Sequence, residues 1–135
     1  MSRWEKFMFE DRIRKILQNV EYYQESHHFG RPFLTAYQIA IECAHRYPDD
    51  FNQIGLPIGG RGIGQHTSLA QYIAGELSRR MRNGELPDFE GSFISNKHLS
   101  EISFEHNDLK VVSSLTNTEY DLSIFRLIDG TKDRR

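Results

Sequence analysis

The stretch GGRGIGQHTS, residues 59–68, places four glycines within six positions and leads directly into a helix. Glycine reaches positive φ angles without a Cβ clash, so this cluster permits a backbone path that other residues resist. Such a path can turn successive N–H groups toward one concavity, and a helix start adds further N–H groups and the positive end of its dipole. The stretch therefore predicts an anion-binding loop. The alternative is a connector that is glycine-rich because it must turn sharply.

Side chains in and around this loop offer further donors to a phosphate or a carboxylate. Ser68 followed by Gln71 has the pattern of a capping box, which predicts Ser68 as the N-cap of the next helix. The predicted anion-binding or nucleic-acid-binding residues within the stretch are Gly60, Arg61, Gly62, Gly64, His66, Thr67 and Ser68.

Two named phosphate-binding motifs come close to this stretch without matching it. Gln65 and His66 stand where a P-loop needs Lys and then Ser or Thr. Residues 60–64 are one glycine short of the dinucleotide fingerprint, and no buried strand precedes either pattern. We therefore predict no nucleotide cofactor.

The helix after the loop, predicted to run from Ser68 to Arg82, has two distinct faces. The apolar residues recur at helical spacing and are expected to face the core: Leu69, Ala70, Ile73, Ala74, Leu77 and Met81. The outward residues are then Gln71, Gly75, Ser78, Arg79 and Arg82. A polar and basic stripe with a small residue in its middle suits close approach to a nucleic-acid groove. The alternative is a solvated helix with its cations near the C-terminus, where the dipole favours them.

Size and composition predict one soluble domain. The chain has 135 residues, of which 38% are hydrophobic and 27% charged, as in ordinary globular proteins. Its formal net charge of −2 argues against a strongly basic nucleic-acid binder but allows one basic face. Basic residues that could form such a face are Arg61, Arg79, Arg80, Arg82 and Lys97.

The sequence also indicates where the protein resides. It has a single cysteine, so no internal disulfide can form. No apolar run approaches the ~20 residues of a membrane span, and no signal peptide is recognisable at the start. We therefore expect a cytoplasmic protein without a membrane partner.

The first segment, residues 1–28, is predicted to be an amphipathic helix. A capping box of Ser2 and Glu5 begins it, and an apolar stripe continues at helical spacing to about Gln24. Trp4, Phe7 and Met8 widen this stripe at its beginning. The stripe either packs on its own domain or holds a homodimer together, because exposed apolar patches commonly mark partners.

Residues 29–128 are predicted to form a helical core followed by a small antiparallel sheet, and 129–135 a charged tail. Thr35 and Gln38 form a capping box for a helix to about Tyr47, and residues 48–54 could add a short helix. From about Gly91 the apolar period becomes two, which predicts strands near 92–94, a hairpin within 101–115 and a last strand within 120–128. Three main helices followed by three or more strands indicate an α+β fold. Two helices followed by a hairpin resembles the order of winged-helix modules over about residues 33–128.

Metal-binding and catalytic patterns are weak in this sequence. His27 and His28 are adjacent and point opposite ways on an extended chain, and Glu42 with His45 lacks the second copy that a metal bundle needs. No Ser/His/Asp or Cys/His grouping stands out. We therefore predict no metal and no catalytic residues, which favours a non-enzymatic protein.

Three functions fit these patterns. The first is a DNA-binding or other nucleic-acid-binding regulatory module, in which Gln71, Ser78, Arg79 and Arg82 face a duplex and Lys97 touches a flanking phosphate. The second is a protein-interaction or inhibitor module that acts through the aromatic N-terminal helix. The third is a phosphate-ligand-binding protein or enzyme that uses the loop at 59–68.

Overall fold

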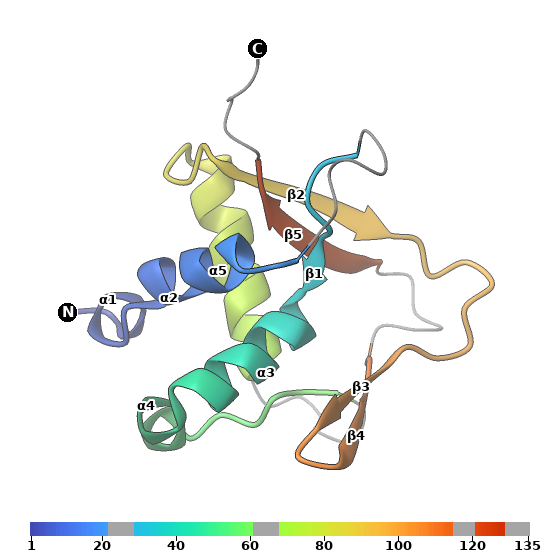
Figure 1. Ribbon diagram of the computed structural model, residues 1–135, viewed down its shortest axis with the longest axis horizontal. Coiled ribbons are helices and arrows are strands. Elements are labelled where there is room, and N and C mark those ends of the chain that lie inside the picture. Colours follow the sequence, from blue (N-terminus) through green and yellow to red (C-terminus); the bar gives the residue numbers. More distant parts are fainter. Residues whose placement is uncertain (22–28, 61–67, 115–120, 129–135) are drawn as a thin grey trace.

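The computed structural model describes residues 1–21, 29–60, 68–114 and 121–128, and it has the α+β architecture that the sequence predicts. A large share of its residues lies in helices that precede most of the strands (Figure 1). In chain order the elements are α1 (Arg3–Lys6), α2 (Phe9–Gln18), β1 (Leu34–Thr35), α3 (Ala36–Arg46), α4 (Pro48–Ile54), α5 (Leu69–Arg82), β2 (Phe89–Ile94), β3 (Ser103–His106), β4 (Leu109–Val112) and β5 (Leu122–Leu127).

The strands form two separate antiparallel sheets. In the larger sheet β5 lies between β1 and β2, with Leu34 and Gly91 both opposite Phe125. Strands β3 and β4 form a hairpin of their own, which turns at Asn107 and Asp108 with positive φ angles. The predicted hairpin is confirmed, but β1 is not predicted, because two residues are too short for any period to show.

The helices gather to one side of the larger sheet, and the hairpin β3–β4 is set apart from it (Figure 1). The side chains at helical spacing make the core, as predicted. Seven of them have no exposed surface: Phe9, Ile13, Ile39, Ala40, Cys43, Ile73 and Leu77. Within the described ranges, no helix is both long enough and apolar enough to cross a membrane.

The N-terminal segment departs from the single long helix that the sequence predicts. Met8 has a left-handed φ of 54°, which divides the segment into α1 and α2, and α2 ends at Gln18 rather than near Gln24. The break lets the ring of Trp4 stack on that of Phe9 at 5.3 Å, so both rings join one core.

This packing bears on the predicted homodimer. Trp4 and Phe7 are buried within the chain at 3% and 8% exposure, and only Met8 of the three proposed contact residues is exposed. Residues 1–18 are therefore part of the core, which is the first of the two alternatives that the sequence leaves open.

Candidate nucleic-acid interface

Helix α5 carries the candidate site, and its position is fixed at both ends. Ser68 is its N-cap, as predicted, and the Ser68 Oγ accepts a hydrogen bond from the Gln71 backbone N–H at 3.0 Å. Near its other end, the Met81 side chain packs against Gly91 of β2. Between these points the buried side chains of α5 enter the core, so its opposite face turns to solvent.

The exposed face of α5 is the one that the sequence predicts. Gln71, Gly75, Ser78 and Arg82 are spaced by four, three and four residues, which places them on one stripe of the helix. Each of them is exposed, and so is Arg79 beside them. We call these five residues the α5 face.

No contact of Gly75 with another described residue requires a glycine at this position. A Cβ atom added at this position would meet nothing within 4 Å. Glycine inside a helix costs roughly 0.5–1 kcal/mol relative to alanine, because its backbone loses more freedom on folding. The residue therefore leaves a flat, open spot in the middle of the α5 face at a cost that packing does not explain.

The arginines of α5 differ in how they are paired. Arg79 Nη2 lies 2.7 Å from Glu76 Oε1, and Arg80 contacts both Glu76 and Glu85 at 3.1 Å. Arg82 makes no ion pair with any residue that the structure describes. Solvent-exposed pairs contribute only about 0–1 kcal/mol, so the half-exposed Arg79 can exchange Glu76 for a phosphate.

One side of the α5 face is bordered by Tyr72 and the N-terminal helix α1. The Arg3 guanidinium carbon lies 5.0 Å from the centre of the Tyr72 ring. Burial, and next the charge of Glu76, raise the pKa of Tyr72 above its usual 10, and the nearby arginines only oppose this. The Tyr72 hydroxyl therefore keeps its proton at neutral pH and can donate a hydrogen bond. Sequence reasoning missed both residues, because no local pattern brings Arg3 to α5.

The described part of the glycine stretch is a packed connector. Leu69 N–H donates to the Pro57 carbonyl at 2.7 Å, and Ala70 N–H donates to the Ile58 carbonyl at 3.0 Å. With Gln71 N–H held by Ser68, the first three amides of α5 all have partners within the chain. The expectation of free amides at this helix start is therefore wrong, because the preceding segment runs alongside it.

The two glycines that precede this helix start are explained by close contacts. A Cβ atom on Gly59 would lie 2.9 Å from Ser68 Oγ, and one on Gly60 would lie 2.7 Å from the Val112 carbonyl oxygen of β4. Other predicted site residues of the stretch lie outside the described residues: Arg61, Gly62, Gly64, His66 and Thr67.

The remaining predicted site residue, Lys97, is not brought to the α5 face. It is exposed in the segment that joins β2 to β3, and its backbone N–H donates to Ser95 Oγ at 3.1 Å. This segment leaves β2 at the end that is remote from α5 (Figure 1). A phosphate bound at Lys97 would be separate from one bound at α5.

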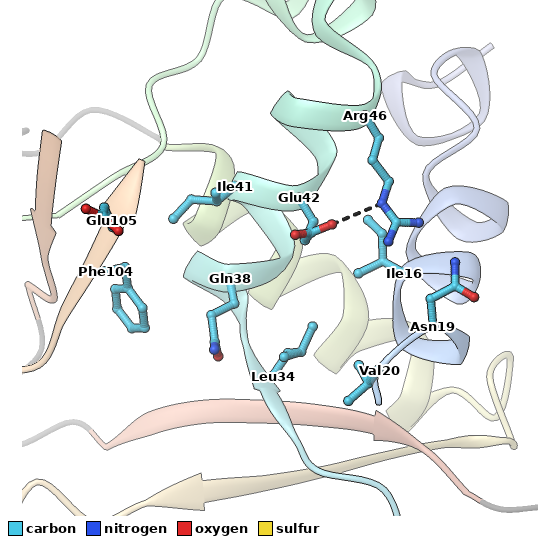
Figure 2. A pocket seen from close by; sticks show the side chains of 10 residues that line it. All are labelled: Ile16, Asn19, Val20, Leu34, Gln38, Ile41, Glu42, Arg46, Phe104 and Glu105. Carbon is cyan, nitrogen blue, oxygen red and sulfur yellow. Dashed lines mark hydrogen bonds and ion pairs between the residues drawn. The ribbon is translucent and has the colours of Figure 1, made fainter. Parts of the chain in front are cut away.

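A hollow of about 400 Å³ lies elsewhere, between α2, β1, α3 and β3 (Figure 2). Ile16, Leu34, Ile41 and Phe104 make its walls apolar, and an ion pair of Arg46 with Glu42 at 3.0 Å borders it. None of the described residues that the sequence predicts as a site lines this hollow.

Cys43 and a pair of histidines, His45 and His106, take part in packing within the described residues. Cys43 is fully buried, and this burial raises the pKa of its thiol to about 12. His45 stacks on His106 of β3 with 5.2 Å between ring centres. No cluster of three or more candidate metal ligands occurs among the described residues.

Comparison with known proteins adds no relative. No protein-family model matches the chain, and neither a curated protein nor a solved structure matches it.

Proposed function

We propose that this protein is a non-enzymatic nucleic-acid-binding module that presents the α5 face to a duplex. The observation that carries the proposal is the exposed polar and basic stripe with Gly75 open at its centre. A helix of 14 residues is ~21 Å long, and the major groove of B-DNA, ~12 Å wide, admits a helix. A glycine on the approaching face lets the helix backbone come close to the groove.

The order of the elements supports this proposal. Helices α3 and α5 are followed along the chain by β2 and β5, which pair antiparallel. Two helices followed by an antiparallel strand pair is the order of winged-helix modules. Here α4 and the glycine connector are inserted between the two helices, and the hairpin β3–β4 is inserted between the two strands.

The side chains of the α5 face suit both kinds of contact that duplex binding needs. Arg79 and Arg82 can donate to phosphates, which position a protein on the duplex without reading its sequence. Gln71 can form two hydrogen bonds to one adenine edge, and an arginine can do the same to guanine. With a net charge of −2, binding depends on this local face and weakens steeply with salt.

Fluorescence anisotropy with labelled duplexes between about 50 and 200 mM salt tests the proposal. Arg82→Gln should weaken binding roughly 5- to 10-fold and reduce the salt slope by about one, since one phosphate contact contributes about 0.9 to that slope. Lys15→Gln makes the same charge change on the exposed surface of α2 and is the matched control. It should change neither the affinity nor the salt slope. An absence of duplex binding at low salt, or binding that salt does not affect, would exclude the proposed function.

Gly75→Glu provides an independent check. The space around Gly75 is open, so the variant should fold, with a circular dichroism spectrum like that of the wild type. The new carboxylate should nevertheless weaken duplex binding roughly tenfold or more, because it places a like charge against the phosphates where the helix must approach. Unchanged affinity would show that the α5 face is not the binding surface.

A further inference from the structure

The guanidinium group of Arg3 lies at the junction of α1 and α5. Arg3 is exposed and makes no ion pair within the part of the chain that the structure describes. Its guanidinium carbon lies 5.0 Å from the centre of the Tyr72 ring, a cation–π contact that uses no N–H donor for a carboxylate. A guanidinium group without a carboxylate partner can donate two parallel hydrogen bonds to a phosphate.

The short helix that carries Arg3 is held firmly for its length. The capping box of Ser2 and Glu5 closes its N-terminus. Trp4, the next residue after Arg3, is buried against Phe9, and the Arg80 guanidinium covers its ring at 4.6 Å. The backbone of Arg3 is therefore fixed beside α5, which lowers the entropy lost when its side chain binds a ligand.

Among the charged groups that act on Tyr72, positive charge exceeds negative charge. Arg3, Arg79 and Arg80 all act electrostatically on Tyr72, where Glu76 is the opposing acid. Glu76 is already shared by two arginines, and Glu85 contacts Arg80 as well. One guanidinium therefore remains in excess beside a tyrosine hydroxyl that can donate a hydrogen bond.

We propose that Arg3 and Tyr72, with Arg79 beside them, form a binding position for one phosphate group of a nucleic-acid backbone. This inference rests on the proposed function and extends it, because it adds a contact from α1 at the border of the α5 face. Arg3 donates two N–H groups to the phosphate oxygens and Tyr72 donates its hydroxyl. The contact fixes the orientation of the duplex on α5 and reads no base.

The test compares three variants in duplex binding across the same salt series. Arg3→Gln should weaken binding roughly 5- to 10-fold and lower the salt slope by about one. Tyr72→Phe keeps the ring under Arg3 and removes one donor, so it should weaken binding roughly 2- to 10-fold with the slope unchanged. Lys15→Gln is the control for the loss of one charge. A cooperative thermal unfolding transition establishes that each variant is folded. If Arg3→Gln does not fold, Tyr72→Phe serves as the test.

The outcomes separate this inference from the function on which it rests. If the wild type binds duplex and Arg3→Gln binds it with the same affinity and salt slope as Lys15→Gln, the proposed phosphate position is wrong. The proposal that the α5 face binds the duplex is then unaffected. If the wild type binds no duplex, the proposed function fails, and inorganic phosphate decides the inference. Phosphate should then shift the NMR signals of Arg3 Nε–H and the Tyr72 ring, and the Tyr72 shift should be absent in Arg3→Gln. No shift in the wild type overturns the inference.

Discussion

The glycines of the connector and the glycine of α5 occur for opposite reasons. Gly59 and Gly60 have φ angles of 131° and 109°, and their missing Cβ atoms would collide with Ser68 Oγ and the Val112 carbonyl oxygen. Gly75 has no positive φ and nothing near it. A cluster of glycines, which suggests a ligand loop, thus serves packing where it is described, whereas no packing contact among the described residues explains the glycine in α5.

The largest effect on stability is expected from a substitution at Gly60. Alanine there must adopt a backbone conformation that L-residues avoid and must displace the β4 backbone, so Gly60→Ala should lower the free energy of unfolding by about 2–4 kcal/mol. Urea unfolding followed by circular dichroism measures this. A loss below about 0.5 kcal/mol would mean that the connector is not packed against the hairpin.

Ser68, which Gly59 contacts, should give the next largest effect. Ser68→Ala removes the acceptor for Gln71 N–H at a position that is 7% exposed, so the free energy of unfolding should fall by about 1–2 kcal/mol. Ser78→Ala is the matched control on the exposed side of the same helix and should change stability by less than about 0.5 kcal/mol. Equal effects of the two changes would place the helix start in solvent.

Gly75→Ala should have the opposite sign. The added methyl group meets open space and restricts the unfolded chain, so the free energy of unfolding should rise by about 0.5–1 kcal/mol. The same urea titration that measures Gly60→Ala measures this gain. A loss of stability here would remove the contrast between the two kinds of glycine.

The smallest effect on stability is expected in the hairpin that covers Gly60, where it should appear as a dependence of stability on pH. Burial, and then the charge of His45, lower the pKa of His106 below its usual 6.5. Because the unfolded chain takes up this proton more readily, stability should fall as the pH drops from about 6.5 through the lowered pKa of His106. His106→Gln should flatten this dependence in urea titrations at pH 7 and pH 5.5. An equal slope in the variant would assign the dependence to other groups.

Much of the helical structure could be predicted from the sequence, because it depends on local chemistry. Capping side chains at Ser2, Thr35 and Ser68 begin three helices as expected. The 3.6-residue period separates the buried side of α5 from its exposed face residue by residue. These features need only neighbours along the chain, so the sequence contains them.

The features that could not be predicted depend on distant segments. The left-handed Met8 divides α1 from α2 although methionine gives no sign of it. The partners of the first α5 amides are carbonyls of residues 57 and 58, and the platform for Arg3 is a ring on another helix. No spacing in the sequence reports such meetings, so the sequence predicts the exposed face of α5 but not the residues that border it.

The placement of β5 has a consequence for synthesis on the ribosome. Strands β1 and β2 do not pair with each other, and each forms its ladder only with β5, the last of the described strands along the chain. A nascent chain that has emerged only as far as β4 can assemble helices and the hairpin β3–β4, but the larger sheet has no ladder to close. The edges of β1 and β2 stay unpaired until β5 has been synthesised. During this time chaperones or neighbouring nascent chains can bind them.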